Sequence, residues 1–156
     1  MIESEQLMKG DYVQFTDDRE VIHIARVIQT MEFTCLIEYT TASGDYIELV
    51  IEYSKLSPVP LHSRILRRLG AGVTELESDP YFFIQPNRMR CFRWEDPYDR
   101  DDFTIDIGIE KDNYHITIFQ RGKIAVNMLY DEKPVMHDLQ HAIKICHINR
   151  EINLLN

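Results

Sequence analysis

The first third of the chain alternates apolar and polar residues with the two-residue period of β-strands. Val, Ile, Tyr and Phe recur in four short segments, which predicts strands over residues 12–15, 21–28, 33–40 and 46–53. Ser43-Gly44, between the last two segments, is typical of a hairpin turn. This pattern predicts an antiparallel meander or small barrel.

Two prolines, Pro58 and Pro60, follow these strands. Proline lacks a backbone donor and restricts the residue before it, so we expect the first sheet to end here. Apolar residues then recur at helical spacing, and glycines follow where a helix would end. The sequence therefore predicts a short connecting helix, with Leu61, Ile65, Leu66 and Leu69 on one side and Gly70 and Gly72 after its end.

The second half of the chain returns to alternation. It predicts strands over residues 81–84, 89–94, 103–109, 114–119 and 123–130. Residues 111–113 and 120–122 resemble tight turns, which favours an antiparallel sheet over βαβ units. Pro134 suits the first turn of a helix, and an amphipathic helix is expected to run from there to about Arg150.

Together these elements predict an α+β fold. It comprises an N-terminal antiparallel SH3-like β unit over residues 1–60, entered through Gly10-Asp11-Tyr12-Val13. Residues 61–156 form a C-terminal α+β unit, in which the connecting helix leads to an antiparallel sheet covered by the C-terminal helix. The two units are either separate domains or one continuous domain.

Composition narrows the function classes. The 156 residues carry a formal net charge of −9, which disfavours nucleic acid as a partner. No apolar run approaches the roughly 20 residues of a membrane span, and the acidic start predicts no leader, so we expect a cytoplasmic protein. The three separated cysteines, Cys35, Cys91 and Cys146, fit small buried hydrophobes in a reducing compartment.

The segment His137-Asp138-Leu139-Gln140-His141 carries the nearest approach to a catalytic signature. It places two imidazoles one helical turn apart, as in the H-E-x-x-H zinc motif, with Asp in place of Glu. Because aspartate is shorter than glutamate, it would reach a metal-bound water poorly, and no third ligand is indicated. A metal-dependent hydrolase using His137 and His141 is therefore an alternative hypothesis.

The same helix carries a second stripe, opposite its predicted core face. Three interpretations are open: packing against another part of the chain, contact with a protein partner or a second copy, and metal binding by the histidines. An apolar row where a surface helix would be polar favours an interface. This predicted interaction surface consists of His137, His141, Ile145, Ile148 and Ile152.

A further alternative concerns one predicted strand. Arginines and aromatics occupy every second position there and therefore share one predicted face, which resembles the platforms that bind single-stranded nucleic acid. The residues are Arg88, Arg90, Phe92 and Trp94. The negative net charge argues against this function.

No nucleophile elbow, P-loop or dinucleotide fingerprint occurs, so no cofactor is expected. Our leading hypothesis is a non-enzymatic cytoplasmic protein that acts through contact with another protein or with a second copy of itself, as a homodimer. Membrane association is not expected.

Two stretches resemble a family of small uncharacterised bacterial and phage-associated proteins. Pro58-Val59-Pro60-Leu61, followed by Ile65-Leu66 and Leu69-Gly70, is similar to its proline-leucine and leucine-glycine signature, and Met136-His137-Asp138-Leu139-Gln140 resembles its V-H-x-L-Q segment. The resemblance spans most of the chain and implies no activity. The chain departs from the family at His141, where asparagine is usual, and at its C-terminal end, which lacks the T-G-x-E-L sequence.

Overall fold

The structure is a computed structural model that describes residues 6–61, 65, 68, 73–75, 88–95, 103–110, 113–148 and 152–155. The chain divides into two compact units. The N-terminal unit comprises Met1–Pro60, Val135–His137 and Ile152–Asn156, and the C-terminal unit comprises Leu61–Pro134 and Asp138–Glu151.

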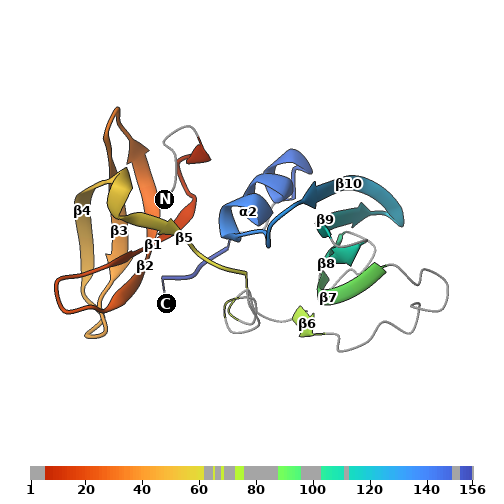
Figure 1. The fold of residues 1–156 in the computed structure, drawn as a ribbon, viewed down its shortest axis with the longest axis horizontal. Helices are drawn as coiled ribbons and strands as arrows, with labels where there is room; N and C mark the ends of the chain where they lie inside the picture. Colours follow the sequence, from red (N-terminus) through yellow and green to blue (C-terminus); the bar gives the residue numbers. More distant parts are fainter. Residues whose placement is uncertain are drawn as a thin grey trace. The chain divides into compact units, whose positions relative to one another are not determined.

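The N-terminal unit contains one antiparallel sheet with the strand order β4-β3-β2-β1-β5. Its strands, drawn from red to yellow in Figure 1, are β1 (Tyr12–Thr16), β2 (Ile22–Thr30), β3 (Thr34–Thr40), β4 (Tyr46–Glu52) and β5 (Leu56–Pro58). A 3-10 turn, η2 (Tyr53–Lys55), precedes β5. The four strands predicted from the alternation are confirmed, with ends shifted by up to two residues.

The sheet ends at the prolines, as predicted, because its last strand, β5, ends at Pro58. Pro58 lies in β5 and pairs in register with Val13 of β1. A strand at the edge of a sheet tolerates proline, because it has a neighbouring strand on one side only and a backbone N–H on its other side is not needed for hydrogen bonding. β1 is consequently paired on both sides, by β2 and by β5.

Alternate residues of these strands point into one hydrophobic core. Val13, Ala25, Cys35 and Ile37 are fully buried there, and Phe15 is nearly so. The remaining residues of the cluster come from all parts of the unit: Leu7, Val27, Ile51, Tyr53 and Leu56. Burial of this apolar area is the main stabilising contribution to the unit.

The turn between β1 and β2 is organised by the carboxylate of Asp17. Its Oδ1 accepts hydrogen bonds from the backbone N–H groups of Arg19 and Val21, each 2.9 Å long. Its Oδ2 lies 2.9 Å from Nε2 of His23, whose ring stacks on Phe15. The hydrogen bond from His23 is the main reason that the pKa of Asp17 lies below its ordinary value of 3.8.

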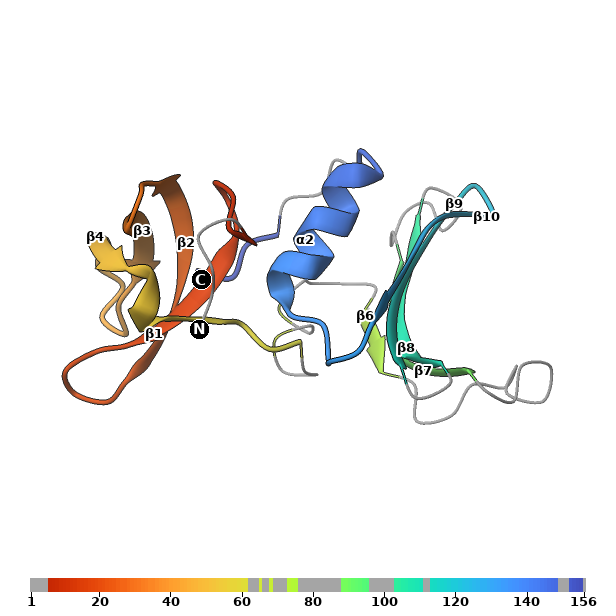
Figure 2. The same ribbon diagram turned by 45° about the horizontal axis from the view of Figure 1, so that its top comes forward.

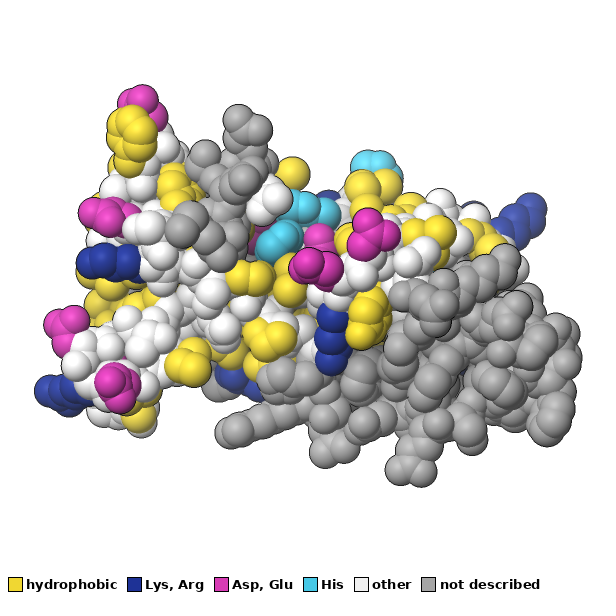
Figure 3. Space-filling view, in the orientation of Figure 1, with side chains coloured by type: hydrophobic (Ala, Val, Ile, Leu, Met, Phe, Trp, Pro, Cys, Tyr) yellow, Lys and Arg dark blue, Asp and Glu magenta, His cyan; other side chains and the backbone are white. Residues whose placement is uncertain are grey.

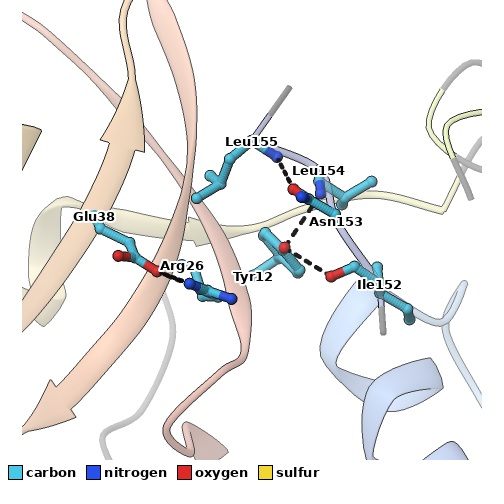
Figure 4. Close-up of polar contacts among 7 residues, drawn as sticks. All are labelled: Tyr12, Arg26, Glu38, Ile152, Asn153, Leu154 and Leu155. Carbon is cyan, nitrogen blue, oxygen red and sulfur yellow. Dashed lines mark hydrogen bonds and ion pairs between the residues drawn. The ribbon is translucent and has the colours of Figure 1, made fainter. Parts of the chain in front are cut away.

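The last described residues are held by the hydroxyl of Tyr12 (Figure 4). This hydroxyl donates a 2.8 Å hydrogen bond to the carbonyl of Ile152 and accepts a 3.1 Å bond from the N–H of Leu154. Tyr12 and Leu154 are each 1% exposed, so both bonds are shielded from water. One side chain of the first strand thus satisfies two backbone groups about 140 residues away in sequence.

The C-terminal unit contains a second antiparallel sheet, with the order β10-β9-β8-β7-β6. Its strands are β6 (Val73–Glu75), β7 (Arg88–Glu95), β8 (Thr104–Glu110), β9 (Asn113–Gln120) and β10 (Lys123–Tyr130). The four predicted strands from residue 89 onward are confirmed, and β6 is additional. The predicted strand 81–84 and most of the predicted connecting helix lie outside the described residues.

One helix, α2 (Met136–Ile145), follows the second sheet and packs on its apolar face (Figure 2). Leu139, Ala142 and Ile143 are buried on the helix, and Ile116 and Ile118 are fully buried on β9. The side chain of Gln120 donates a 3.1 Å hydrogen bond to the carbonyl of Cys146, just after the helix. Two antiparallel sheets with a C-terminal helix confirm the α+β class.

The described cysteine side chains behave as buried hydrophobes. Cys35 and Cys146 are free thiols, and burial raises the pKa of Cys35 to about 11 and also raises that of Cys146. Cys91 has a side chain outside the described set. Within the described residues, no helix combines the length and apolarity that a membrane crossing requires.

The lowered pKa of Asp17 predicts a pH-dependent contribution to stability. A carboxylate whose pKa falls on folding stabilises the fold above its ordinary pKa, and this contribution is lost as the pH falls through the lowered value. We expect Asp17→Asn to unfold at lower urea than the wild type at pH 7, with a difference that shrinks on acidification. The exposed neighbour Asp18 provides the control, and an equal effect of Asp18→Asn would contradict the assignment.

The hydroxyl of Tyr12 yields a second prediction. Tyr12→Phe leaves one N–H and one C=O of the C-terminal segment without their partner, at a cost of about 1–2 kcal/mol in the free energy of unfolding. Amide hydrogen exchange at Leu154 should accelerate in parallel. Tyr46→Phe removes a hydroxyl from an exposed side chain and should change stability by less than about 0.5 kcal/mol.

Candidate protein-contact surface

The stripe predicted along the C-terminal helix is not continuous. α2 ends at Ile145, so only His137, His141 and Ile145 lie on it, whereas Ile148 and Ile152 follow its end. The expectation that the helix reaches about Arg150 is therefore wrong. Helical spacing cannot place these five residues on one face.

The helix stops early because its backbone closes a Schellman motif. The N–H of Ile148 donates to the carbonyl of Ile143, and the N–H of His147 donates to that of Lys144. His147 has a φ of 54°, in the left-handed region that glycine normally occupies at this position. Histidine gives no sequence signal for such an end, and the apolar periodicity continues past it.

The two histidines of α2 differ in burial. His137 is 8% exposed, so it offers little surface to a partner. His141 is half-buried, and Ile145 is exposed. Of the predicted residues on the helix, only Ile145 offers a large apolar surface to solvent.

The metal hypothesis gains no further ligand from the fold. In the described part of the chain, no three His, Cys, Asp or Glu side chains are grouped to hold a metal ion. The His137 and His141 pair would supply two ligands, whereas catalytic zinc sites take three from the protein. Metal-dependent hydrolysis by this pair stays an untested prediction.

The arginine and aromatic strand does not alternate as expected. The register of β7 against β8 shifts between Arg90 and Phe92. Arg88 and Arg90 therefore pair with Glu110 and Gly108, while Phe92 and Trp94 pair with Ile107 and Ile105. These partners have opposite parity on β8, so the backbone register does not continue the predicted alternation through this strand.

Trp94 is buried rather than presented to solvent. It is 7% exposed, and its ring meets that of Phe103 edge-to-face, with centroids 5.4 Å apart. Such a ring belongs to the core of the C-terminal unit. Nucleic-acid binding through this strand stays an untested prediction.

A polar row crosses the second sheet, and sequence reasoning missed it. The register aligns Arg93, Asp106, Thr117 and Asn127 across four strands. Arg93 binds the buried carboxylate of Asp106 through Nε and Nη2, at 2.9 and 3.2 Å, and Thr117 donates a 2.8 Å bond to Asn127. These groups engage one another, which favours a role in fixing strand register over ligand binding.

A different surface emerges on the N-terminal sheet, on the face opposite its core. The register aligns Tyr12, Arg26, Glu38 and Glu48 across β1 to β4. Arg26 forms an ion pair with Glu38 (Figure 4). Glu38 is 5% exposed and pairs in register with the exposed Glu48 of β4. The ion pair of Arg26 and Glu38 therefore lies between the buried side chain of Tyr12 on β1 and the exposed strand β4.

Apolar side chains stand beside these charges at the exposed end. Tyr46 and Val50 are both 58% exposed on β4, and Val50 pairs with the half-buried Leu36. Phe33, just before β3, is 74% exposed. Figure 3 shows hydrophobic and acidic side chains together on the N-terminal strands. We define the β4 surface as Leu36, Tyr46, Glu48 and Val50.

The concentration of these residues is informative. Eight of the eleven large hydrophobic side chains that the described residues leave exposed lie between Met8 and Val50, so the N-terminal unit offers several apolar groups to a partner. A sequence signal for the β4 surface exists. Residues 46–52 read Tyr-Ile-Glu-Leu-Val-Ile-Glu, with apolar residues at both parities, although only one parity faces the core.

Comparisons of the chain with protein-family models, curated proteins and solved structures find no match. The resemblance to the bacterial and phage-associated family stays a prediction.

The Schellman motif gives a prediction for the helix end. His147→Gly places glycine at a left-handed position and should stabilise the protein by about 0.5–1 kcal/mol. Lys144→Gly, in the last right-handed turn, should destabilise it by about 0.7 kcal/mol. Urea unfolding measures both. A loss of stability in both variants would contradict the assigned helix end.

Proposed function

We propose that this chain is a cytoplasmic, non-enzymatic protein that acts by binding another protein, and that the β4 surface makes the contact. The observation that carries the proposal is the exposure of Tyr46 and Val50 on a strand that also carries the exposed Glu48. Exposed apolar patches mixed with polar groups are typical of protein interfaces.

The chemistry of the surface supports binding rather than catalysis. It combines an aromatic ring and aliphatic side chains with the carboxylate of Glu48, and the partly buried ion pair of Arg26 and Glu38 lies beside it on the same face of the sheet. Aromatic residues supply much of the binding energy at interfaces. The carboxylate of Glu48 would add orientation and selectivity for a positively charged partner.

We also propose that the N-terminal unit has an SH3-like arrangement. Support comes from the strand order, in which β1 lies between β2 and β5, and from the 3-10 turn that precedes β5. Folds of this size carry many unrelated functions, so the arrangement itself implies no particular ligand. The proposed contact depends on the side chains of β4.

Substitution of the two exposed residues tests the function. We expect Tyr46→Ser combined with Val50→Ser to weaken retention of the partner by at least about tenfold, because burial of each side chain would contribute about 1.5–3 kcal/mol. The full chain would be immobilised, and proteins retained from an extract of the source organism quantified by mass spectrometry.

The second sheet offers a matched control. Ile124 and Leu129 are 61% and 57% exposed on its edge strand β10. Their double replacement by serine removes a similar apolar area from the other unit and should leave retention unchanged. Equal retention by all three proteins, or an equal loss in both variants, would contradict the proposed function.

A further inference from the structure

The edge of β4 has the regularity that strand addition requires. β4 pairs with β3 through seven consecutive residue pairs without a register shift, and the described residues provide no strand on its other side. An edge strand presents backbone N–H and C=O groups outward, as a template for another strand.

The edge of the second sheet is different. β10 has a register shift between Ile124 and Val126 and begins with Lys123, which is exposed. Bulges and lysines are features that protect an edge from pairing. β4 contains neither a bulge nor a lysine, so β4 is the edge suited to binding a strand.

The negative charge of the hairpin formed by β3 and β4 indicates the chemistry of the partner. Residues 31–52 contain five carboxylates and no Lys, Arg or His. On β4 the exposed Glu48 and Glu52 alternate with Tyr46 and Val50 on the face away from the core. A strand beside β4 would therefore meet carboxylates and apolar groups in turn.

A second copy of the chain fits this pattern poorly. In an antiparallel pairing of two β4 strands centred on Leu49, Glu48 would lie diagonally next to Glu48 and Glu52 of the second copy. A two-residue shift of the register would place carboxylates directly opposite each other. Like charges in these positions destabilise a sheet, and each chain carries a net charge of −9.

We propose that the edge of β4 binds, by strand addition, an extended segment of another protein. Every second residue of this segment, on one face of the strand, is basic (Lys or Arg) and apolar in turn. The basic side chains contact Glu48 and Glu52, and the apolar ones contact Tyr46 and Val50. Backbone hydrogen bonds along β4 supply the affinity that side chains alone would not give. This inference rests on the proposed function and names the chemistry of its partner.

Fluorescence anisotropy with the full chain and a labelled eight-residue peptide, Lys-Thr-Val-Thr-Lys-Thr-Val-Thr, tests the inference, because Lys and Val then alternate on one face of the added strand. We expect saturable binding that weakens with salt, no binding of the Glu and Val counterpart, and no binding when every second amide of the peptide is N-methylated. Failure of the Lys and Val peptide to bind, or equal binding of its N-methylated form, would overturn strand addition.

Protein variants locate the site. Glu48→Gln with Glu52→Gln should raise the dissociation constant by about tenfold, whereas Glu132→Gln, an exposed carboxylate in the other unit, should leave it unchanged. An equal effect of Glu132→Gln would show non-specific attraction and overturn the site. A dimer in light scattering that Val50→Ser dissociates would identify a second copy as the occupant and also overturn it.

The outcomes separate this inference from the proposed function. If the serine variants of Tyr46 and Val50 lose a retained protein but the peptides do not bind, the contact surface stands and the basic strand is wrong. If the peptides bind as expected but no retained protein depends on Tyr46 and Val50, strand addition at β4 is supported and the proposed protein-binding function is wrong.

Discussion

The pairing of β1 on both sides is the constraint on which the N-terminal unit depends. β2 bonds to one edge of β1 and β5 to the other, while Val13 and Phe15 enter the core. Tyr12 points to the opposite face and holds the backbone of residues 152 and 154. A one-residue shift of β1 would exchange these faces, so the register of the whole sheet follows from it.

This arrangement leaves the two ends of the sheet unequal. β5 has three residues and includes a proline, whereas β4 has seven residues in unbroken register with β3. The exposed apolar side chains and carboxylates therefore gather at the β4 end. In the C-terminal unit the apolar face of the sheet is covered by α2, and the opposite face carries the aligned row of Arg93, Asp106 and Thr117.

Alternation along the chain predicted eight strands that the structure confirms. It failed where backbone geometry departs from the ideal period. The register shift after Arg90 separates residues that alternation would place together. The left-handed conformation of His147 ends α2 before Ile148, although the apolar pattern continues. Neither a β-bulge nor a helix end at a residue other than glycine can be recognised from the residue types alone.

The sequence by itself determined the α+β class, the antiparallel pairing within each half and the burial of Cys35 and Cys146, because these follow from local periodicity and hydrophobicity. Only the tertiary structure decided which strand is an edge, that Pro58 joins the first sheet, and that His137 is buried. Those properties depend on contacts between residues far apart in the chain. The candidate surface moved from the C-terminal helix to β4 for that reason: exposure is set by the neighbours that folding supplies.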